Sequence, residues 1–371
     1  MSEAKLSNIP AVSVDKMTEI LTEMYASVIE RYMPLGILPS VMLWGPPGVG
    51  KSQGVRAVAR AVGERTGKEC RVTDVRLLLF NPIDLRGIPT ANADKTLAVW
   101  LRPKIFDMDP SPDIVNILFL DEISAAPQSV QAAAYQITLD RTVGEHRLPD
   151  NCIVIAAGNR LTDKSVAYKM PKALANRLLH MEIEGSFDSF SMWAVKNAIH
   201  PKVIGFLSFR RNYLMSFDSA SEDLAFATPR SWEMVSNILR GVSEDETHVY
   251  PLIAGLVGAG VAAEFRTWCK VYSQLPSIED IFAGKAVPVP QSTDALYALT
   301  ASMTAYAREH RKELDRIANS IRFAEKLPPD FSAVLLRDYM YLEKDFKTTL
   351  MKMPEFVRWF EKRGHLLNGN I

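Results

Sequence analysis

Residues 40–52 read Ser40-Val-Met-Leu-Trp-Gly-Pro-Pro-Gly-Val-Gly-Lys-Ser52, and they carry the strongest indication of the fold. An apolar run typical of a buried strand leads into a loop of glycines and prolines that ends on a lysine and a hydroxyl. The spacing Gly-x-x-x-x-Gly-Lys-Ser is that of a phosphate-binding loop between a strand and a helix. We therefore expect a polyphosphate to be held by Gly45, Pro46, Pro47, Gly48, Val49, Gly50, Lys51 and Ser52.

Each fixed residue of this loop has a physical task. Glycines let backbone N–H groups approach phosphate oxygens, and the positive end of the following helix faces them. Lys51 is expected to bridge the β- and γ-phosphates, and Ser52 to ligate Mg²⁺. A plain Gly/Pro-rich turn would not explain the Lys-Ser pair.

The composition indicates a soluble globular protein. The chain has 371 residues, which is long enough for two domains. Of these residues 47% are apolar and 23% are charged, an ordinary composition for a globular protein. Lys+Arg and Asp+Glu are both 43, so no net field draws the chain to nucleic acid or to an anionic membrane. The N-terminus has no signal-peptide pattern and no stretch is apolar enough to span a membrane, which leads us to expect a cytoplasmic protein. Its cysteines, Cys70, Cys152 and Cys269, lack zinc-site or disulfide spacing.

The order of elements predicts an α/β core followed by helices. After an amphipathic helix over residues 16–33, apolar runs at 41–44, 71–75, 117–120 and 153–156 alternate with helical patterns at 53–62 and 129–139. Such alternation predicts a parallel sheet with helices on both faces. We expect an N-terminal helix (1–34), an α/β core (35–187), an α-helical lid (188–287) and a helical C-terminal extension (288–371).

Polar side chains end two of the predicted strands, where a parallel sheet presents residues to a ligand. Asp121 is expected to hold Mg²⁺, and Glu122 to orient the water that attacks the γ-phosphate. The Asn159 amide could reach both the γ-phosphate and that water. The alternatives are an acid that caps the next helix and a turn initiated by asparagine.

Two arginines follow in positions that suit a shared site. Arg177 lies between a short helix and a strand, from where it could stabilise transition-state charge in a neighbouring subunit. Arg230 follows Thr228-Pro229 at the start of a lid helix and could face the γ-phosphate. The alternatives are an arginine facing the last carbonyls of its helix and a surface pair with Glu233.

This ordered set of motifs resembles the AAA+ ATPases, a branch of the P-loop NTPases. The resemblance covers residues 35–284 and assigns the names Walker A, Walker B, sensor 1, arginine finger and sensor 2 to the groups above. Softer matches resemble the MoxR branch and its dynein-related relatives, namely Asp84-Leu-Arg-Gly87, Trp100-Leu-Arg-Pro103, Ala156-Ala-Gly-Asn159, Thr228-Pro-Arg230 and Gly258-Ala-Gly260.

The resemblance implies an ATPase that uses ATP and Mg²⁺ and assembles into a homo-oligomeric ring, usually a hexamer. Such proteins act as chaperones on a protein substrate, with a von Willebrand factor A domain protein as partner. The segment 81–104 resembles a moving insert near the pore, with Trp100 and Leu101 as apolar contacts; the alternative is a loop folded on the core. The extension after residue 288 is longer than the family core requires.

Other functions remain open at this point. A nucleic-acid translocase or restriction-type motor would share the motifs, but the zero net charge disfavours it. A nucleotide-gated scaffold would bind ATP with little turnover, although Glu122 and Asn159 favour hydrolysis. No Asn-Lys-x-Asp guanine reader is present, which disfavours a GTPase.

Overall fold

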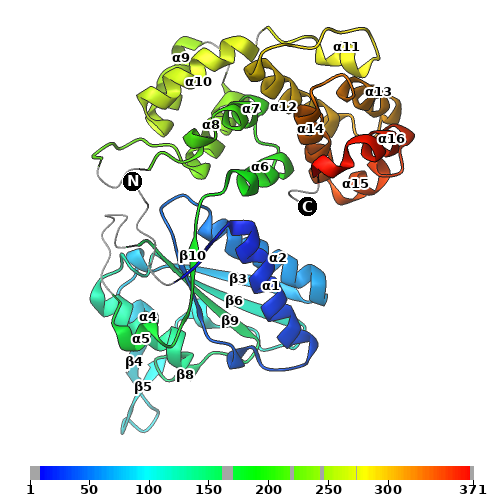
Figure 1. Ribbon diagram of the computed structural model, residues 1–371. Helices are drawn as coiled ribbons and strands as arrows, with labels where there is room; N and C mark the ends of the chain where they lie inside the picture. Colours follow the sequence, from blue (N-terminus) through cyan, green and yellow to red (C-terminus); the bar gives the residue numbers. More distant parts are fainter. Residues whose placement is uncertain (1–8, 161–169, 218–220, 243–245, 273, 368–371) are drawn as a thin grey trace. The chain divides into compact units, whose positions relative to one another are not determined.

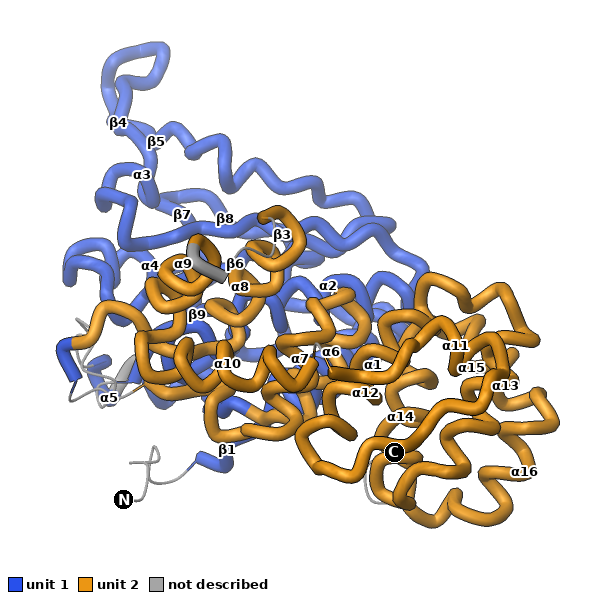
Figure 2. The backbone as a smooth tube through the Cα atoms, turned by 90° about the horizontal axis from the view of Figure 1, so that it is seen from above, with its two compact units in different colours: residues 1–185, 218–222 blue, residues 186–217, 223–371 orange. Residues whose placement is uncertain are grey.

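The computed structural model describes residues 9–160, 170–217, 221–242, 246–272 and 274–367 (Figure 1). The chain divides into two compact units, coloured separately in Figure 2. Unit 1 comprises residues 1–185 and 218–222, and unit 2 comprises residues 186–217 and 223–371. Among the helices formed by the described residues, none has both the length and the apolar character needed to cross a membrane.

Unit 1 is built on the parallel sheet that the sequence predicts. Its strand order is β1-β10-β2-β9-β6-β3. The strands in that order are Ala11–Val12, Leu179–Ile183, Val41–Trp44, Cys152–Gly158, Ile114–Asp121 and Glu69–Arg76. Because β6 and β9 are central, their side chains are buried on both faces, which explains their uninterrupted apolar runs.

Helices cover both faces of this sheet, as the alternating pattern predicts. Figure 1 shows α1 (Val14–Glu30) and α2 (Lys51–Thr66) on one face and α4 (Gln128–Asp140) on the other. Helix α1 packs along α2, and its buried side chains include Met17, Leu21 and Ile29. Two short helices, α3 (Pro82–Arg86) and α5 (Lys172–Ala175), complete the unit.

Unit 1 also contains two antiparallel hairpins that were not predicted. Strands β4 (Ile88–Ala91) and β5 (Ala98–Leu101) form one, inside the predicted insert, and β7 (Thr142–Val143) and β8 (His146–Arg147) form the other. The first hairpin is exposed along β4, so it lacks the apolar alternation by which a strand is recognised.

The regular secondary structure formed by the described residues of unit 2 is all helical. Its longer helices are α6 (Phe187–Lys196), α7 (Pro201–Phe209), α8 (Pro229–Gly241), α9 (Glu246–Val257), α10 (Ala259–Tyr272), α12 (Thr293–Glu309), α13 (Leu314–Ala324), α14 (Pro329–Leu342) and α16 (Pro354–Arg363). Short helices α11 (Ile278–Phe282) and α15 (Lys344–Leu350) join them. One hydrophobic cluster runs from Phe190 to Leu367, so residues on both sides of the expected boundary at 288 share a core. A separate extension beyond 288 stays a prediction.

A buried carboxyl group makes the stability of unit 2 depend on pH. Asp338 in α14 is 4% exposed, and burial raises its pKa to about 6 despite the neighbouring Arg337 guanidinium at 3.2 Å. The folded state therefore binds this proton more tightly than the unfolded state, and stability rises as pH falls through the folded pKa. We expect Asp338 to add about 1 kcal/mol to the free energy of unfolding between pH 7.5 and pH 5.

Asp338→Asn isolates this contribution, since other groups titrate over the same range. Urea unfolding of both proteins at pH 7.5 and 5 measures it. We expect the pH-dependent difference to be smaller in the variant, and an unchanged difference would show that Asp338 keeps an ordinary pKa.

Candidate functional site

The phosphate loop joins β2 to α2 through backbone that glycine alone adopts without strain. Gly48 has φ +75° and Gly50, the N-cap of α2, has φ +110°. The Lys51 side chain is 8% exposed and lies within the loop. Its ammonium donates to the carbonyls of Gly45 at 2.6 Å and Pro46 at 3.1 Å. These hydrogen bonds within the loop hold the turn of the phosphate loop that the sequence predicts.

Residues distant in sequence meet at the carboxyl ends of the central strands. The Ser52 hydroxyl donates to Asp121 Oδ2 at 2.9 Å, across 69 residues of sequence. Lys51 Nζ donates to Asn159 Oδ1 at 3.1 Å, across 108 residues. The Asn159 backbone N–H donates to Ser124 Oγ at 2.9 Å, which holds the end of β9 against the loop after β6. Four of the residues singled out from sequence therefore lie in one cluster.

Glu122 has a backbone conformation that the sequence did not predict. Its φ is +60°, a region that non-glycine residues avoid, and its side chain is exposed. The backbone N–H of Glu122 donates to Asp121 Oδ1 at 2.9 Å, so the carboxylate that bonds Ser52 also holds this turn. Strained backbone of this kind gathers at functional sites.

The oxygen groups at this edge suit Mg²⁺ bound together with phosphate. Mg²⁺ prefers hard oxygen ligands and uses one or two carboxylates, with phosphate and water completing its shell. Ser52 and Asp121 supply a hydroxyl and a carboxylate 2.9 Å apart. In the described part of the chain, no three His, Cys, Asp or Glu side chains gather as a metal site, so an all-protein cage is not formed there.

The two arginines have different settings. Arg177 lies in the turn after α5, exposed, and forms no ion pair with any described residue. Arg230 is the second residue of α8 in unit 2, where Thr228 caps the helix by accepting the N–H of Ser231 at 3.1 Å. The alternative reading of Arg230, a surface pair with Glu233, is not found among the ion pairs of the described residues. The two units are described separately, so a role for Arg230 at the loop stays a prediction.

Two side-chain links near the loop were not predicted. Arg160, directly after Asn159, pairs at 2.8 Å with Glu182 of β10, which is 1% exposed. The Trp44 indole N–H donates to His180 Nδ1 at 2.9 Å. Strand register brings these partners together. The β10–β2 ladder places His180 opposite Met42 and Glu182 opposite Trp44, and the β2–β9 ladder places Trp44 opposite Gly158, two residues before Arg160. The sequence carries no local signal for either link.

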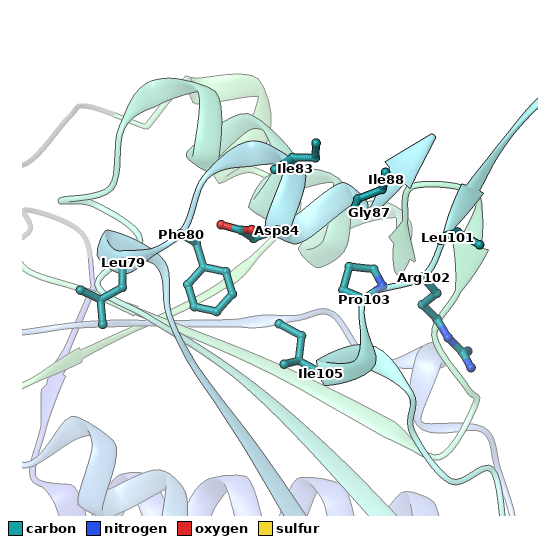
Figure 3. Close-up of a pocket in the computed structure, with 10 residues that line it drawn as sticks. All are labelled: Leu79, Phe80, Ile83, Asp84, Gly87, Ile88, Leu101, Arg102, Pro103 and Ile105. Carbon is teal, nitrogen blue, oxygen red and sulfur yellow. The ribbon is translucent and has the colours of Figure 1, made fainter. Parts of the chain in front are cut away.

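The insert and the residues that flank it, 78–105, carry a concentration of exposed apolar side chains. They are Leu78, Leu79, Ile83, Ile88, Leu97, Leu101 and Ile105. A shallow hollow of about 440 Å³ opens among several of them, and Figure 3 shows Phe80, Pro103 and Ile105 converging on it. Trp100, expected as an apolar contact, is half-buried, and its carbonyl lies 2.7 Å from His146 Nε2. The base of the hairpin is therefore held by β8 through His146.

Gly87, directly before β4, allows the backbone of the β4–β5 hairpin to pack closely at its base. Its φ is +91°, and an added Cβ would lie 1.9 Å from the Leu101 carbonyl oxygen. We expect Gly87→Ala to detach the β4–β5 hairpin locally and to raise its rate of proteolytic cleavage at least tenfold, while global unfolding changes little. Limited proteolysis with mass mapping measures this. Gly67→Ala is the matched control, because Gly67 also has positive φ (+70°) but no atom within 4 Å.

Comparisons with known proteins agree with the motifs. Residues 40–180 match the family described as "ATPase family associated with various cellular activities (AAA)". The "Chaperone MoxR1" of Mycobacterium tuberculosis is 30% identical over 158 residues, covering 41% of this chain and 38% of MoxR1. The "Uncharacterized protein YeaC" of Bacillus subtilis is 29% identical over 159 residues, covering 41% of this chain and 44% of YeaC.

The chain thus spans less than half the length of either relative. A solved structure of NtrX from Brucella abortus in complex with ATP aligns with 93% of this chain and 68% of NtrX, at 16% identity and a TM-score of 0.34. Residues 40–180 thus match the AAA family of ATPases, and the chain is similar to MoxR1 over a similar length.

Proposed function

We propose that the protein binds ATP with Mg²⁺ and hydrolyses it at the edge of the β2–β9–β6 strands. The observation that carries this is the meeting of Lys51 with Asn159 and of Ser52 with Asp121 across long stretches of sequence. In this proposal Lys51 neutralises charge on the β- and γ-phosphates, and Ser52 and Asp121 hold Mg²⁺. Bound Mg²⁺ would supply charge neutralisation at the phosphates.

Glu122 and Asn159 are assigned to the attacking water. The Glu122 carboxylate accepts the proton of that water, and the Asn159 amide fixes the position of the water and of the γ-phosphate. Glu122 suits this role because it is exposed beside Asp121 rather than used in an ion pair among the described residues. Its strained φ supports a functional rather than a packing role.

We further propose a homo-oligomeric ring, a hexamer by family resemblance, in which Arg177 completes the site of a neighbouring subunit. The Arg177 guanidinium is exposed and pairs with no carboxylate of the described residues, which supports a contact with another subunit. Arg230 would sense the γ-phosphate from unit 2 and couple that unit to nucleotide state. The cysteines, which are free, support a reducing cytoplasmic location.

We propose that the ring remodels a protein substrate, with a von Willebrand factor A domain protein as partner, as the chaperone name of MoxR1 suggests. The exposed apolar side chains of the insert support a surface that contacts protein, because a monomer rarely leaves such a group uncovered without function.

Mass measurement of Glu122→Gln, with and without Mg²⁺-ATP, tests the shared site. We expect ATP to convert the variant to a discrete oligomer, and the additional change Arg177→Ala to weaken that assembly. Arg60→Ala is the matched control, since Arg60 is also exposed and forms no ion pair with a described residue. A monomer under every condition would contradict the ring and remove Arg177 from the site.

A further inference from the structure

His180 links the strand before the phosphate loop to the turn that carries Arg177. Trp44, the last residue of β2, donates its indole N–H to His180 Nδ1 at 2.9 Å. On the other side of the ring, His180 Nε2 lies 2.8 Å from the Ala175 carbonyl oxygen. The indole and imidazole rings meet edge to edge through this bond, with centroids 6.1 Å apart and planes 22° from parallel.

These partners determine which ring nitrogen carries the proton. An indole N–H only donates, so Nδ1 must accept, and a carbonyl only accepts, so Nε2 must donate. The neutral imidazole with its proton on Nε2 therefore satisfies both neighbours.

The Ala175 carbonyl is the point from which the Arg177 turn is held. Helix α5 is a single turn that ends at Ala175, and the Leu178 N–H closes the next turn by donating to the same carbonyl at 3.2 Å. Arg177 lies within that closure, and its side chain is exposed. His180 donates a second hydrogen bond to the carbonyl, which leaves the turn less freedom.

We infer that His180 is a positioning residue for Arg177, and that Trp44 selects the tautomer in which it does so. This inference rests on the proposed role of Arg177 in a neighbouring subunit. Since Trp44 directly precedes Gly45, the same link ties the phosphate loop of one subunit to the arginine that this subunit offers to the next.

A subunit-mixing experiment tests the inference. Lys51→Ala subunits have no working ATP site but an intact arginine, whereas Arg177→Ala subunits have an ATP site but no arginine. A mixture should recover ATP turnover at sites where a Lys51→Ala subunit supplies its arginine to the ATP site of an Arg177→Ala subunit. His180→Phe keeps a ring against Trp44 without the hydrogen bonds. Placed in the Lys51→Ala subunits, it should lower the recovered kcat about tenfold, as expected for losing roughly 1.4 kcal/mol of hydrogen bonding.

The placement of the substitution separates positioning from a general effect on the sheet. His180→Phe in the Arg177→Ala subunits should change recovered kcat less than twofold. His180→Gln restores a donor near Nε2 and should recover most of the activity. Trp44→Phe in the arginine-supplying subunits should lower kcat about threefold, the effect of a neutral hydrogen bond, and remains testable if His180→Phe misfolds. His310→Phe is the control, because His310 also contacts an aromatic ring, with its ring centroid 4.1 Å from that of Tyr306 in unit 2.

The outcomes distinguish the role of His180 from the shared ATP site. Equal losses in both placements would show that the pair only stabilises the sheet, which overturns the inference and leaves the proposed function standing. No recovery in the unsubstituted mixture would overturn the shared site and, with it, the role assigned to His180. A donor-side loss rescued by glutamine supports the inference.

Discussion

Glu122→Gln is expected to slow ATP turnover roughly 10²- to 10⁴-fold, the range typical for removing a general base. The amide keeps the size of the side chain but cannot take a proton from water. ATP binding should persist, because the contacts of Lys51, Ser52 and Asp121 do not involve the Glu122 side chain. Steady-state phosphate release together with fluorescent-nucleotide titration measures both quantities.

The control for this variant is Glu64→Gln, which changes an exposed glutamate on α2 outside the strand-end cluster. Its turnover should match that of the unaltered protein. If Glu122→Gln hydrolysed ATP at the normal rate, the water would be activated by another group, and the assignment of Glu122 would be wrong. If both turnover and binding were lost, Glu122 would instead be needed for the shape of the loop.

Trp232→Ala is expected to destabilise unit 2 by about 3–5 kcal/mol, the usual cost of truncating a large buried aromatic side chain. Trp232 is 0% exposed and contacts Phe206 and Phe265 at centroid distances of 5.5 and 5.6 Å. Its indole N–H donates to the Tyr213 carbonyl at 2.7 Å, so the truncation leaves that carbonyl without this donor. Calorimetry or denaturant unfolding measures the loss.

Trp232→Phe separates the packing from the hydrogen bond. The smaller aromatic ring retains most contacts with Phe206 and Phe265 but cannot donate to Tyr213, so we expect a loss of about 1–3 kcal/mol. Equal losses in the alanine and phenylalanine variants would mean that the hydrogen bond, rather than ring packing, dominates at this position.

Strand and helix positions in unit 1 were predictable wherever burial imposes a period. The apolar runs around Ile117 and Ile153 belong to central strands, and the helix after Lys51 begins at the residue that the motif requires. Strand β1 has only 2 residues, too few to show any period. Strand β4 contains Pro89 and is exposed, so it presents neither the residue preference nor the alternation of a half-buried strand.

The candidate site was predictable to the extent that its chemistry lies in short motifs. The loop, Asp121 and Asn159 carry local signals, and the structure brings them together. The pairs Arg160–Glu182 and Trp44–His180 arise from strand register between segments far apart in sequence, which no local pattern encodes. The positive φ of Glu122 was likewise not predictable, because glutamate has no preference for the left-handed backbone region.

The bonds of Lys51 to Gly45 and Pro46 have a consequence for the kinetics of nucleotide capture. They shape the loop from within the chain, so its conformational entropy is lost during folding rather than on association. A preorganised cradle needs no slow rearrangement, and the encounter can approach the rate set by diffusion and orientation. Differences in affinity among loop variants should then appear mainly as differences in how long the nucleotide stays.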